Sequence, residues 1–483
     1  MAESYDVVIV GAGISGIDTA YRMQEQCPDR TYTILEGKAA LGGTWEQFKF
    51  PGIRSDSDLH TFGFPFRPWK EENAIAEAAP IVKYLNETAQ EYGIDRKIQF
   101  HHKVKAADWS SDQQSWNLDV DGNGQRKRMN CKFLLLCTGY FDHDSALPAK
   151  IPGIENFQGT VIHPQFWPED LDYTGKNVVI VGSGATAITL LPNVAKKAAH
   201  VTQLQRSPTF VVALPQDDVV NRAARSFLPT SWSFKFIRMK YLLAAWLFYK
   251  YCRLFPAPSR RMLKKGVAQS LPKGYNLNPN FEPKYQPWDQ RVCFTPKGDY
   301  FQALSTEKAD VITATIKNVT NNSIMLDDGN VLRPDIIVTA TGLRVLMAGG
   351  INMSVDKQPV DVPEKFIYKG MMIQDVPNAA VAIGYTNASW TLGSDCTAHF
   401  ITRLLNHMKS NDYTSATPHV DQSQPLKERN LLELNSTYIV KAKGALPKGG
   451  DRWPWLPRTM YLRDLWEAKH GAYTELDFAS VST

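Results

Sequence analysis

The sequence predicts an α/β fold made of two Rossmann-like dinucleotide-binding domains, with the second domain and a helical subdomain inserted into the first. Three observations favour this fold. A glycine-rich turn follows an apolar strand at residues 5–16, the same arrangement recurs at residues 177–187, and two further apolar strands, at residues 132–140 and 335–343, end in Thr-Gly. The composition, with 43% hydrophobic and 21% charged residues over 483 positions, excludes a disordered or coiled-coil chain.

The first glycine-rich turn has each part of a dinucleotide-binding unit. The strand YDVVIV precedes Gly11, Gly13 and Gly16, a helical stretch follows, and a second strand ends in Glu36. The glycines allow a tight turn, close approach of a pyrophosphate and packing of the helix on the sheet, while the helix N-terminus favours the negative charge. Glu36 is placed to accept hydrogen bonds from an adenosine ribose. A glycine turn without a ligand is the alternative interpretation.

The second unit repeats this pattern with one change of charge. The strand NVVIV leads into Gly182, Gly184 and Ala187, and the strand after the next helix ends in Arg206 and Ser207, where the first unit has its acidic residue. A carboxylate repels a 2′-phosphate, whereas a guanidinium pairs with one. We therefore expect FAD in the first unit and NADPH in the second. A solvent-exposed surface arginine is the alternative for Arg206.

The strands that end in Thr-Gly mark where the chain passes between the domains, because an apolar strand that stops at glycine suggests a chain leaving its sheet. We expect an FAD-binding domain at residues 1–145 and 370–483. The NADPH-binding domain is expected at residues 146–214 and 285–369, and a basic helical insertion at residues 215–284.

The insertion carries an unusual charge. Twelve lysines and arginines and no aspartate or glutamate lie between Val219 and Phe281, whereas the rest of the chain has more acidic than basic residues. Two interpretations stay open: helices that cover a substrate pocket, and an amphipathic surface that contacts anionic lipid. No nucleic-acid-binding motif accompanies the basic residues.

Other features of the sequence bear on the compartment. The six cysteines are scattered without a C-x-x-C motif or zinc-like pairing, so we expect a reducing compartment and no metal site. No secretory signal or run of 18 apolar residues is present. We expect a cytoplasmic protein that is able to contact a membrane peripherally through residues 219–281.

A further motif lies between the two glycine-rich units. The segment FQGTVIHPQFWP contains Phe157, Gly159, His163, Trp167 and Pro168. Spacing alone makes His163 a hydrogen-bonded residue on an irregular linker. The pattern F-x-G-x-x-x-H-x-x-x-W-P, however, resembles the fingerprint of Baeyer–Villiger monooxygenases, which are class B flavin monooxygenases. GAGISG, LGGTW, FPGIRSDSD, GSGATA, LQRSP, PWDQR and GYTNASWT extend the resemblance over almost the whole chain.

The resemblance implies an FAD-containing, NADPH- and O2-dependent enzyme. Such an enzyme oxidises ketones to esters or lactones and oxygenates sulfides or thioamides through a flavin peroxide. An N- or S-oxygenating flavin monooxygenase without ketone activity and a non-catalytic flavoprotein remain alternatives. A disulfide reductase is disfavoured, since it needs a cysteine pair beside the flavin and Cys27 stands alone.

The resemblance also implies roles for single residues. Arg291 is expected to reach over the flavin as a catalytic residue, because a fixed guanidinium stabilises negative charge on a reacting oxygen, and Asp56 to orient it. An ordinary surface ion pair is the alternative for Arg291. The residues expected to contact FAD are Gly11, Gly13, Ser15, Gly16, Glu36, Gly43, Thr44, Trp45, Glu46, Gln47, Asp56 and Val104. Those expected to contact NADPH are Arg54, Ser55, Asp56, Gly182, Ser183, Gly184, Ala185, Thr186, Ala187, Ile188, Arg206 and Ser207.

One position departs from the family pattern. Many Baeyer–Villiger enzymes have a lysine directly before the catalytic arginine, and Gln290 stands there in this chain. The preference for NADPH over NADH therefore depends more heavily on Arg206 and Ser207. We expect His163 to be a hinge residue between the domains and not a general base.

Overall fold

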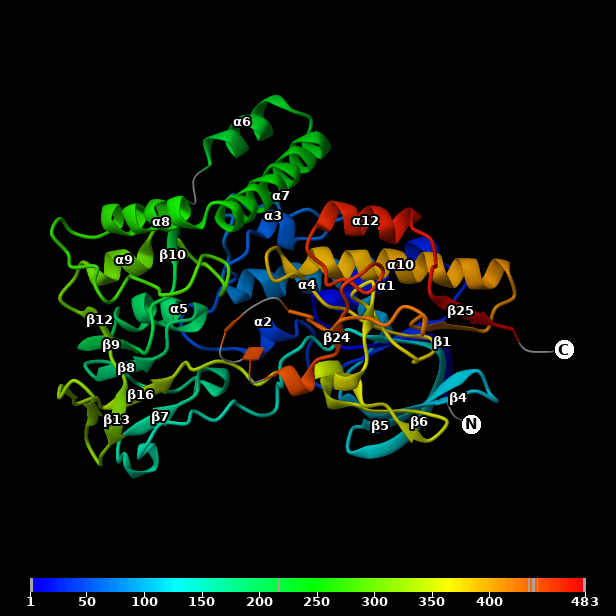
Figure 1. Ribbon diagram of the computed structural model, residues 1–483, viewed down its shortest axis with the longest axis horizontal. Coiled ribbons are helices and arrows are strands. Elements are labelled where there is room, and N and C mark those ends of the chain that lie inside the picture. The colour runs from blue at the N-terminus through cyan, green and yellow to red at the C-terminus, as the bar shows by residue number, and fades with distance from the viewer. Residues whose placement is uncertain (1–2, 216–217, 433–434, 437–438, 441, 481–483) are drawn as a thin grey trace.

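The computed structural model describes residues 3–215, 218–432, 435–436, 439–440 and 442–480. It has two lobes, each built around a sheet with parallel strands, and a group of helices that projects above them (Figure 1). The predicted α/β fold with two Rossmann-like units is confirmed.

The first unit contains a nine-stranded sheet. Its strands are, in sheet order, β18 (Gln358–Pro359), β17 (Asn352–Val355), β4 (His102–Ser110), β5 (Ser115–Gly122), β6 (Gln125–Leu136), β1 (Glu3–Val10), β2 (Tyr32–Leu35) and β3 (Ile98–Gln99), while β21 (Ala379–Val381) also pairs with β6. Strand β1 runs parallel to both β2 and β6. Its side chains from Val7 to Ile9 are fully buried, as expected for a strand that is apolar on both faces.

Helices cover this sheet and complete the first core. They are α1 (Ile14–Gln26), α4 (Ala78–Glu91), α10 (Trp390–Ser410) and α12 (Tyr461–His470). Helix α1 packs against α10, and α10 packs against α12. The C-terminal part of the chain is thus part of the same unit as the first glycine-rich turn (Figure 1).

The second unit has a five-stranded, wholly parallel sheet. Its order is β12 (Ala309–Thr313), β9 (His200–Gln205), β8 (Asn177–Val181), β16 (Ile336–Thr339) and β7 (Thr160–Ile162). Helices α5 (Ala185–Val194) and α9 (Asp299–Leu304) pack beside it. A small antiparallel sheet of β13 (Ile316–Val319), β14 (Ile324–Leu326) and β15 (Val331–Leu332) lies at its edge (Figure 1).

Short elements join and flank these sheets. They are α2 (Thr44–Gln47), α3 (Leu59–Phe62), β10 (Val211–Leu214), β11 (Cys293–Pro296), β19 (Ile367–Tyr368), β20 (Met372–Ile373), β22 (Ser415–Pro418), β23 (Arg429–Asn430), β24 (Lys448–Gly449) and β25 (Leu476–Ala479). Strands β10 and β11 form a parallel pair between the second sheet and the projecting helices (Figure 1).

The chain passes twice between the units, and the two crossings lie side by side. The N–H of Asp142 donates to the carbonyl of Arg344 at 2.8 Å, and the N–H of Leu346 donates to the carbonyl of Tyr140 at 3.0 Å. After the second crossing, β17 pairs with β4 and β18 pairs with β17, so residues 352–359 belong to the nine-stranded sheet of the first unit. These strands are very short and their partner is remote along the chain, so no local pattern marks them.

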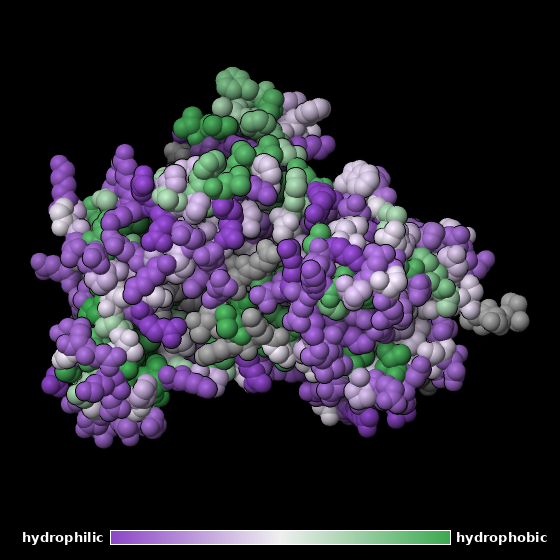
Figure 2. Space-filling view, viewed as in Figure 1, coloured by the Kyte–Doolittle hydropathy of each residue, from purple (hydrophilic) through white to green (hydrophobic). Residues whose placement is uncertain are grey.

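The basic insertion is helical. Helices α6 (Val219–Phe227) and α7 (Thr230–Leu254) form a hairpin that projects from the molecule, and α8 (Pro256–Ser270) leads back to the second unit (Figure 1). Hydrophobic side chains gather on the surface of this hairpin (Figure 2). Over the described residues, none of the helices combines the length and the apolar character needed to cross a membrane.

Candidate functional site

The first glycine loop has a backbone that only glycine tolerates. Gly11 has a φ of +103°, and a Cβ atom there would lie 2.7 Å from the carbonyl oxygen of Cys137 at the end of β6. A Cβ at Gly16 would lie 2.0 Å from the carbonyl oxygen of Gly11, so the third glycine lets α1 pack against the turn. Gly13 is the N-cap of α1 and supplies no side chain to the first-turn N–H groups, which leaves them available to an anion.

The second glycine loop has the same geometry. Gly182 has a φ of +146°, and its Cβ would lie 2.2 Å from the carbonyl oxygen of Ala340 at the end of β16. Gly184 is the N-cap of α5 with φ and ψ of −80° and −178°, close to the −79° and −170° of Gly13. Both loops therefore present the N-terminus of a helix in the same way.

The charged residues at the ends of the second strands occupy equivalent places. Glu36 follows β2 directly, and its carboxylate accepts hydrogen bonds from the N–H of Ala12 at 2.8 Å and of Lys38 at 2.9 Å. Arg206 follows β9 directly and is exposed, with Ser207 half-buried beside it. The difference in charge noted in the sequence is thus placed at matching positions of the two units.

A cavity of about 390 Å³ begins at the first glycine loop. Ten of the twelve residues expected to contact FAD line it: Gly11, Gly13, Ser15, Glu36, Gly43, Thr44, Trp45, Glu46, Asp56 and Val104. Gly16 and Gln47 do not line the cavity, since Gly16 packs against the turn and the Gln47 side chain bonds Lys38. The glycine at position 43 has a φ of +57° and leaves room between its turn and Gly13.

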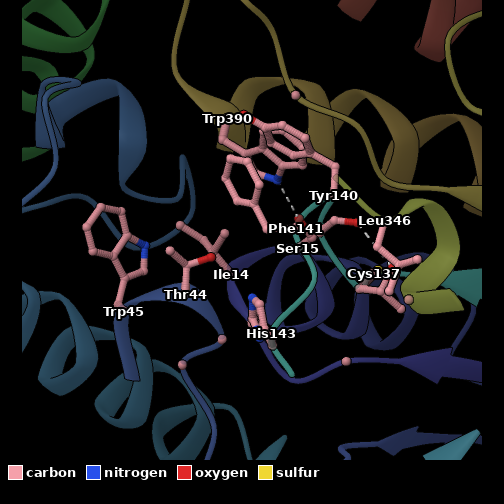
Figure 3. Close-up of a pocket in the computed structure, with 18 of the residues that line it drawn as sticks. Ile14, Ser15, Thr44, Trp45, Cys137, Tyr140, Phe141, His143, Leu346 and Trp390 are labelled. Atoms are coloured by element: carbon pink, nitrogen blue, oxygen red, sulfur yellow. Dashed lines mark hydrogen bonds between the residues drawn. The ribbon is translucent and has the colours of Figure 1, made fainter. Parts of the chain in front are cut away.

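Aromatic residues that the sequence analysis did not single out form another wall of this cavity. The indole N–H of Trp390 donates to the hydroxyl of Ser15 at 3.0 Å, and the Trp390 ring stacks on Tyr140 with centroids 5.0 Å apart. Figure 3 shows these rings with Phe141 opposite Thr44 and Trp45. Their sequence signal is their position directly after a strand that ends in Thr-Gly and within GYTNASWT.

Two further features of the cavity lining are distinctive. The pairing of β4 with β5 shifts register between Val104 and Ala106, and such a bulge re-aims the backbone beside Val104. His143 also lines the cavity, and burial lowers the pKa of its imidazole to about 4. A neutral imidazole is therefore present there at neutral pH.

Asp56 and Arg291 lie where this cavity meets a second one. Their side chains approach to 3.8 Å, between Nη2 of Arg291 and Oδ1 of Asp56. The second cavity has a volume of about 460 Å³, and Asp56, Ser57, Arg291, Tyr385 and Ala388 line both. The lining of the second cavity is mainly apolar and comes from α7, β10, the segment before β11 and the start of α12.

Arg54 lines neither cavity. Its guanidinium forms a two-armed ion pair with the carboxylate of Asp299, the first residue of α9, with Nη2 and Oδ1 3.2 Å apart, and the Arg54 side chain is buried. Ser55, which was expected beside it, does line the first cavity. The structure therefore separates these two predicted NADPH contacts. Asp56 lines both cavities, whereas the other predicted contacts, at 182–188 and 206–207, line neither cavity and lie on the second unit.

The linker motif is built into the second unit. Phe157 packs in an apolar cluster with Ile337 of β16, and a Cβ at Gly159 would lie 2.5 Å from the carbonyl oxygen of Asp335. Trp167 is buried in the core of the second unit, whereas Pro168 is exposed.

His163 connects the linker to the second crossing. Its Nδ1 accepts from the N–H of Gln165 at 3.2 Å, so the proton lies on Nε2, which donates to the carbonyl of Gly342 at 3.3 Å. Burial lowers the pKa of this imidazole. His163 lines neither cavity, and its role as a hinge residue stays a prediction.

Metal ligands are not grouped in the described part of the chain. Over those residues, no set of three or more His, Cys, Asp or Glu side chains is placed to hold a metal ion.

Known proteins resemble this chain in sequence and in fold. Residues 4–242 match the family described as flavin-binding monooxygenase-like.

The FAD-containing monooxygenase EthA of Mycobacterium tuberculosis is 45% identical over 466 residues, which cover 96% of this chain and 95% of that protein. A probable FAD-binding monooxygenase, AlmA of an Acinetobacter species, is 42% identical over 477 residues, 98% of this chain and 96% of that protein. A structure described as oxidized steroid monooxygenase bound to NADP matches with a TM-score of 0.75 and 17% identity, covering 99% of this chain and all of that one.

Proposed function

Because the chain belongs to the flavin-binding monooxygenase-like family, we propose that it is an FAD-containing enzyme that uses NADPH and O2 to oxygenate a small molecule in the manner of Baeyer–Villiger monooxygenases. Its membership among the flavin monooxygenases confirms the resemblance predicted from the motifs. We propose ketones, which would yield esters or lactones, and sulfides or thioamides as the substrates.

The observation that carries this proposal is the junction of the two cavities. One cavity begins at a dinucleotide-type glycine loop, the other is apolar, and Asp56 and Arg291 stand where they meet. A cofactor in the first cavity and an apolar substrate in the second would therefore meet beside a guanidinium. Concave, mainly apolar sites with a few convergent polar groups are typical of small-molecule binding.

The first cavity fits FAD. The phosphates would lie at the N-terminus of α1, where Gly13 leaves the N–H groups uncapped, and Glu36 and Val104 would bind the adenosine half. Thr44, Trp45 and Asp56 would hold the flavin ring near Arg291. When bound, FAD supplies hydride acceptance from NADPH and the activation of O2.

Arg291 and Asp56 would provide the electrostatics of oxygen transfer. The Arg291 guanidinium holds negative charge that develops on the reacting oxygen, and Asp56, 3.8 Å away, orients it. The apolar lining of the second cavity excludes water, which strengthens this interaction.

The second unit would bind NADPH. Gly182 to Ile188 present the N-terminus of α5 to the pyrophosphate, and Arg206 with Ser207 would bind the 2′-phosphate. We propose that the FAD-binding domain comprises the strands and helices around the nine-stranded sheet and the NADPH-binding domain those around the five-stranded sheet, with residues 352–359 in the former.

Anaerobic reduction followed by oxygen tests the proposal. Purified protein should contain flavin, NADPH should bleach its absorbance, and addition of O2 with a ketone or sulfide should give the ester or the sulfoxide. Arg291→Ala should keep flavin content and bleaching but lose product at least 100-fold, as removal of a donor to a developing oxyanion does. Arg126→Ala, which removes an exposed arginine–aspartate pair, is the matched control. Hydrogen peroxide as the sole product of the wild-type protein would refute the proposal.

We also propose that the helical insertion contacts anionic membrane. Thirteen of the twenty large hydrophobic side chains that are exposed in the described residues lie between Val219 and Met262, within the segment that lacks acidic residues. Such a surface binds anionic lipid through apolar burial and charge together. Flotation with phosphatidylglycerol vesicles should be strong at low salt and weak at high salt. Absence of flotation at low salt would discard this contact.

A further inference from the structure

Helix α7 has little of its surface covered. Among its 25 residues only Ser233, Ile237 and Cys252 are buried, although the helix is rich in apolar and aromatic side chains. Part of its surface lines the second cavity, from Tyr241 to Phe248, and another part faces outward with Trp232 68% exposed. Helix α7 thus lies between part of the cavity and the outer surface of the protein.

Five residues line the second cavity and are exposed: Pro215 after β10, Leu243 and Ala244 of α7, Thr459 just before α12 and Leu462 in α12. Four of the five lie on α7 or at the start of α12. Leu243 of α7 and Leu462 of α12 both line the second cavity, and each is 42% exposed. Trp466, one turn along α12 from Leu462, is exposed as well. Residues that are both exposed and cavity-lining mark where a cavity opens, so the mouth lies between α7 and α12.

The mouth is on the same side of the molecule as the apolar hairpin. In Figure 1, α6, α7, α8 and α12 all lie along one side, and Figure 2 shows hydrophobic residues over the hairpin. The tip carries Phe227, which is 86% exposed, and Trp232. A flat partner that covers the hairpin would therefore also face the mouth.

Charge identifies the partner. Lys235 and Lys250 are exposed on α7, and Lys265 on α8, within a stretch of twelve basic and no acidic residues. Three other basic residues of the stretch, Lys240, Arg253 and Lys264, form ion pairs with acidic residues outside it. Exposed apolar and aromatic side chains beside exposed lysines complement a bilayer that contains anionic lipid: the apolar side chains enter the acyl boundary and the cations meet the headgroups.

We propose that the enzyme takes its substrate directly from an anionic bilayer, through the mouth between α7 and α12, and that its substrates include apolar molecules with long alkyl chains that dissolve in the membrane. This inference rests on the proposed monooxygenase function and on the proposed membrane contact. The carbonyl or sulfur end enters first and reaches Arg291, while the alkyl chain follows along Leu243, Phe248 and Leu462.

Matched ketones in the two phases test this route. The holoenzyme is assayed with 2-butanone in water and with 2-tridecanone in vesicles of phosphatidylcholine, with and without phosphatidylglycerol, and ester formation is measured. Wild-type protein should turn over 2-tridecanone at least tenfold faster with anionic than with neutral vesicles, and this advantage should disappear at high salt.

Variants separate docking from chemistry. Phe227→Ser with Trp232→Ser removes two exposed side chains at the tip, neither of which lines a cavity. It should lose at least tenfold on vesicle-borne 2-tridecanone while its kcat/KM for 2-butanone stays within twofold. Met325→Ser with Val331→Ser, which removes exposed apolar residues on the small sheet of the second unit, should change neither rate. Leu243→Trp with Leu462→Trp should narrow the mouth and slow 2-tridecanone more than 2-butanone.

The outcomes are distinct. Equal rates with anionic and neutral vesicles overturn the proposal, and so does an equal loss of the Phe227→Ser/Trp232→Ser variant on both ketones. The proposal is also overturned if this variant loses self-association while its rate on vesicle-borne 2-tridecanone is unchanged. The hairpin would then be a contact between two copies of the chain and not a membrane contact. If neither ketone yields an ester and no sulfide is oxygenated, the result refutes the proposed monooxygenase function and does not bear on the route of substrate entry.

Discussion

Gly184→Ala tests whether the second glycine loop holds NADPH, because the protein itself leaves this position open. A Cβ atom built at Gly184 meets nothing within 4 Å, and its φ of −80° suits any residue. The folded chain therefore does not require glycine at this site. A pyrophosphate that approaches the N-terminus of α5 does require it, because the methyl group would push the phosphates away.

The size of the effect follows from the contacts at risk. Displacement should cost one or two hydrogen bonds from first-turn N–H groups to a charged phosphate, each worth about 1.5–3 kcal/mol. At about 1.4 kcal/mol per tenfold change, the Kd for NADPH should rise at least tenfold. Alanine at the N-cap costs about 1 kcal/mol of stability, so the Tm should fall by only a few degrees.

The assay measures anaerobic flavin reduction at increasing NADPH, with flavin content and Tm measured in parallel. Two variants bracket the result. Gly182→Ala should lose stability as well as NADPH affinity, since its Cβ would lie 2.2 Å from the Ala340 carbonyl oxygen at a φ of +146°. Gly266→Ala, on the exposed part of α8 with nothing within 4 Å, should change neither property adversely. Unchanged NADPH affinity in Gly184→Ala would refute the assigned binding mode of the second loop.

Three further changes have defined outcomes. Arg206→Gln removes one charge-assisted hydrogen bond to the 2′-phosphate, so the ratio of kcat/KM for NADPH to kcat/KM for NADH should fall about tenfold or more. Wild-type protein that turns over NADH as fast as NADPH would contradict this prediction. His163→Ala removes the bond to the Gly342 carbonyl and should slow turnover several-fold at unchanged flavin content; equal turnover would exclude the hinge role. Burial holds the pKa of His60 at about 4, below its value of about 6.5 in the unfolded chain. As the pH drops, the unfolded chain therefore takes up this proton before the folded chain does. The free energy of unfolding falls between about pH 6.5 and about pH 4 as a result. In His60→Gln the slope of that decline in denaturant titrations should be smaller by up to about 1.4 kcal/mol per pH unit, and an equal slope would contradict the assignment.

The glycine loops were predictable because their constraints are local. Gly11 and Gly182 adopt positive φ within a few residues of an apolar strand, so strand, turn and helix all lie in one short window of sequence. The opposite charges of Glu36 and Arg206 follow by counting to the end of the next strand.

Other features depend on contacts between remote segments. The pairing of β17 with β4 and the ion pair of Arg54 with Asp299 join residues that are more than 240 positions apart. Trp390 belongs to a motif noted in the sequence, but its bond to Ser15 appears only when α10 packs on α1. For α7 the sequence left two interpretations open, a cover over a pocket and an exposed amphipathic surface, because its apolar pattern alone is also compatible with a buried helix.

The contact between Asp56 and Arg291 depends on how the two units are placed. Two ion pairs join the segment 54–56 to the second unit. Arg54 pairs with Asp299 of α9, and Asp56 pairs with Arg291, which lies just before β11. The segment that carries Asp56 is also bonded to the first unit through its backbone, from the Ser55 N–H to the Ala76 carbonyl at 3.0 Å.

A shift between the units would therefore act on the side-chain pairs before it acts on the backbone bonds. Arg291 would move with β11, whereas the segment of Asp56 is held by both units, because Phe48 and Phe50 pack in the core of the second unit and the Ser55 N–H bonds the Ala76 carbonyl. The 3.8 Å separation is thus sensitive to the relative position of the two units. The same shift would displace Arg291 relative to Trp390 and Tyr140, which belong to the first unit. Oxygen transfer at the junction of the cavities would then depend on the state of the nucleotide-binding unit even though its glycine loop lines neither cavity.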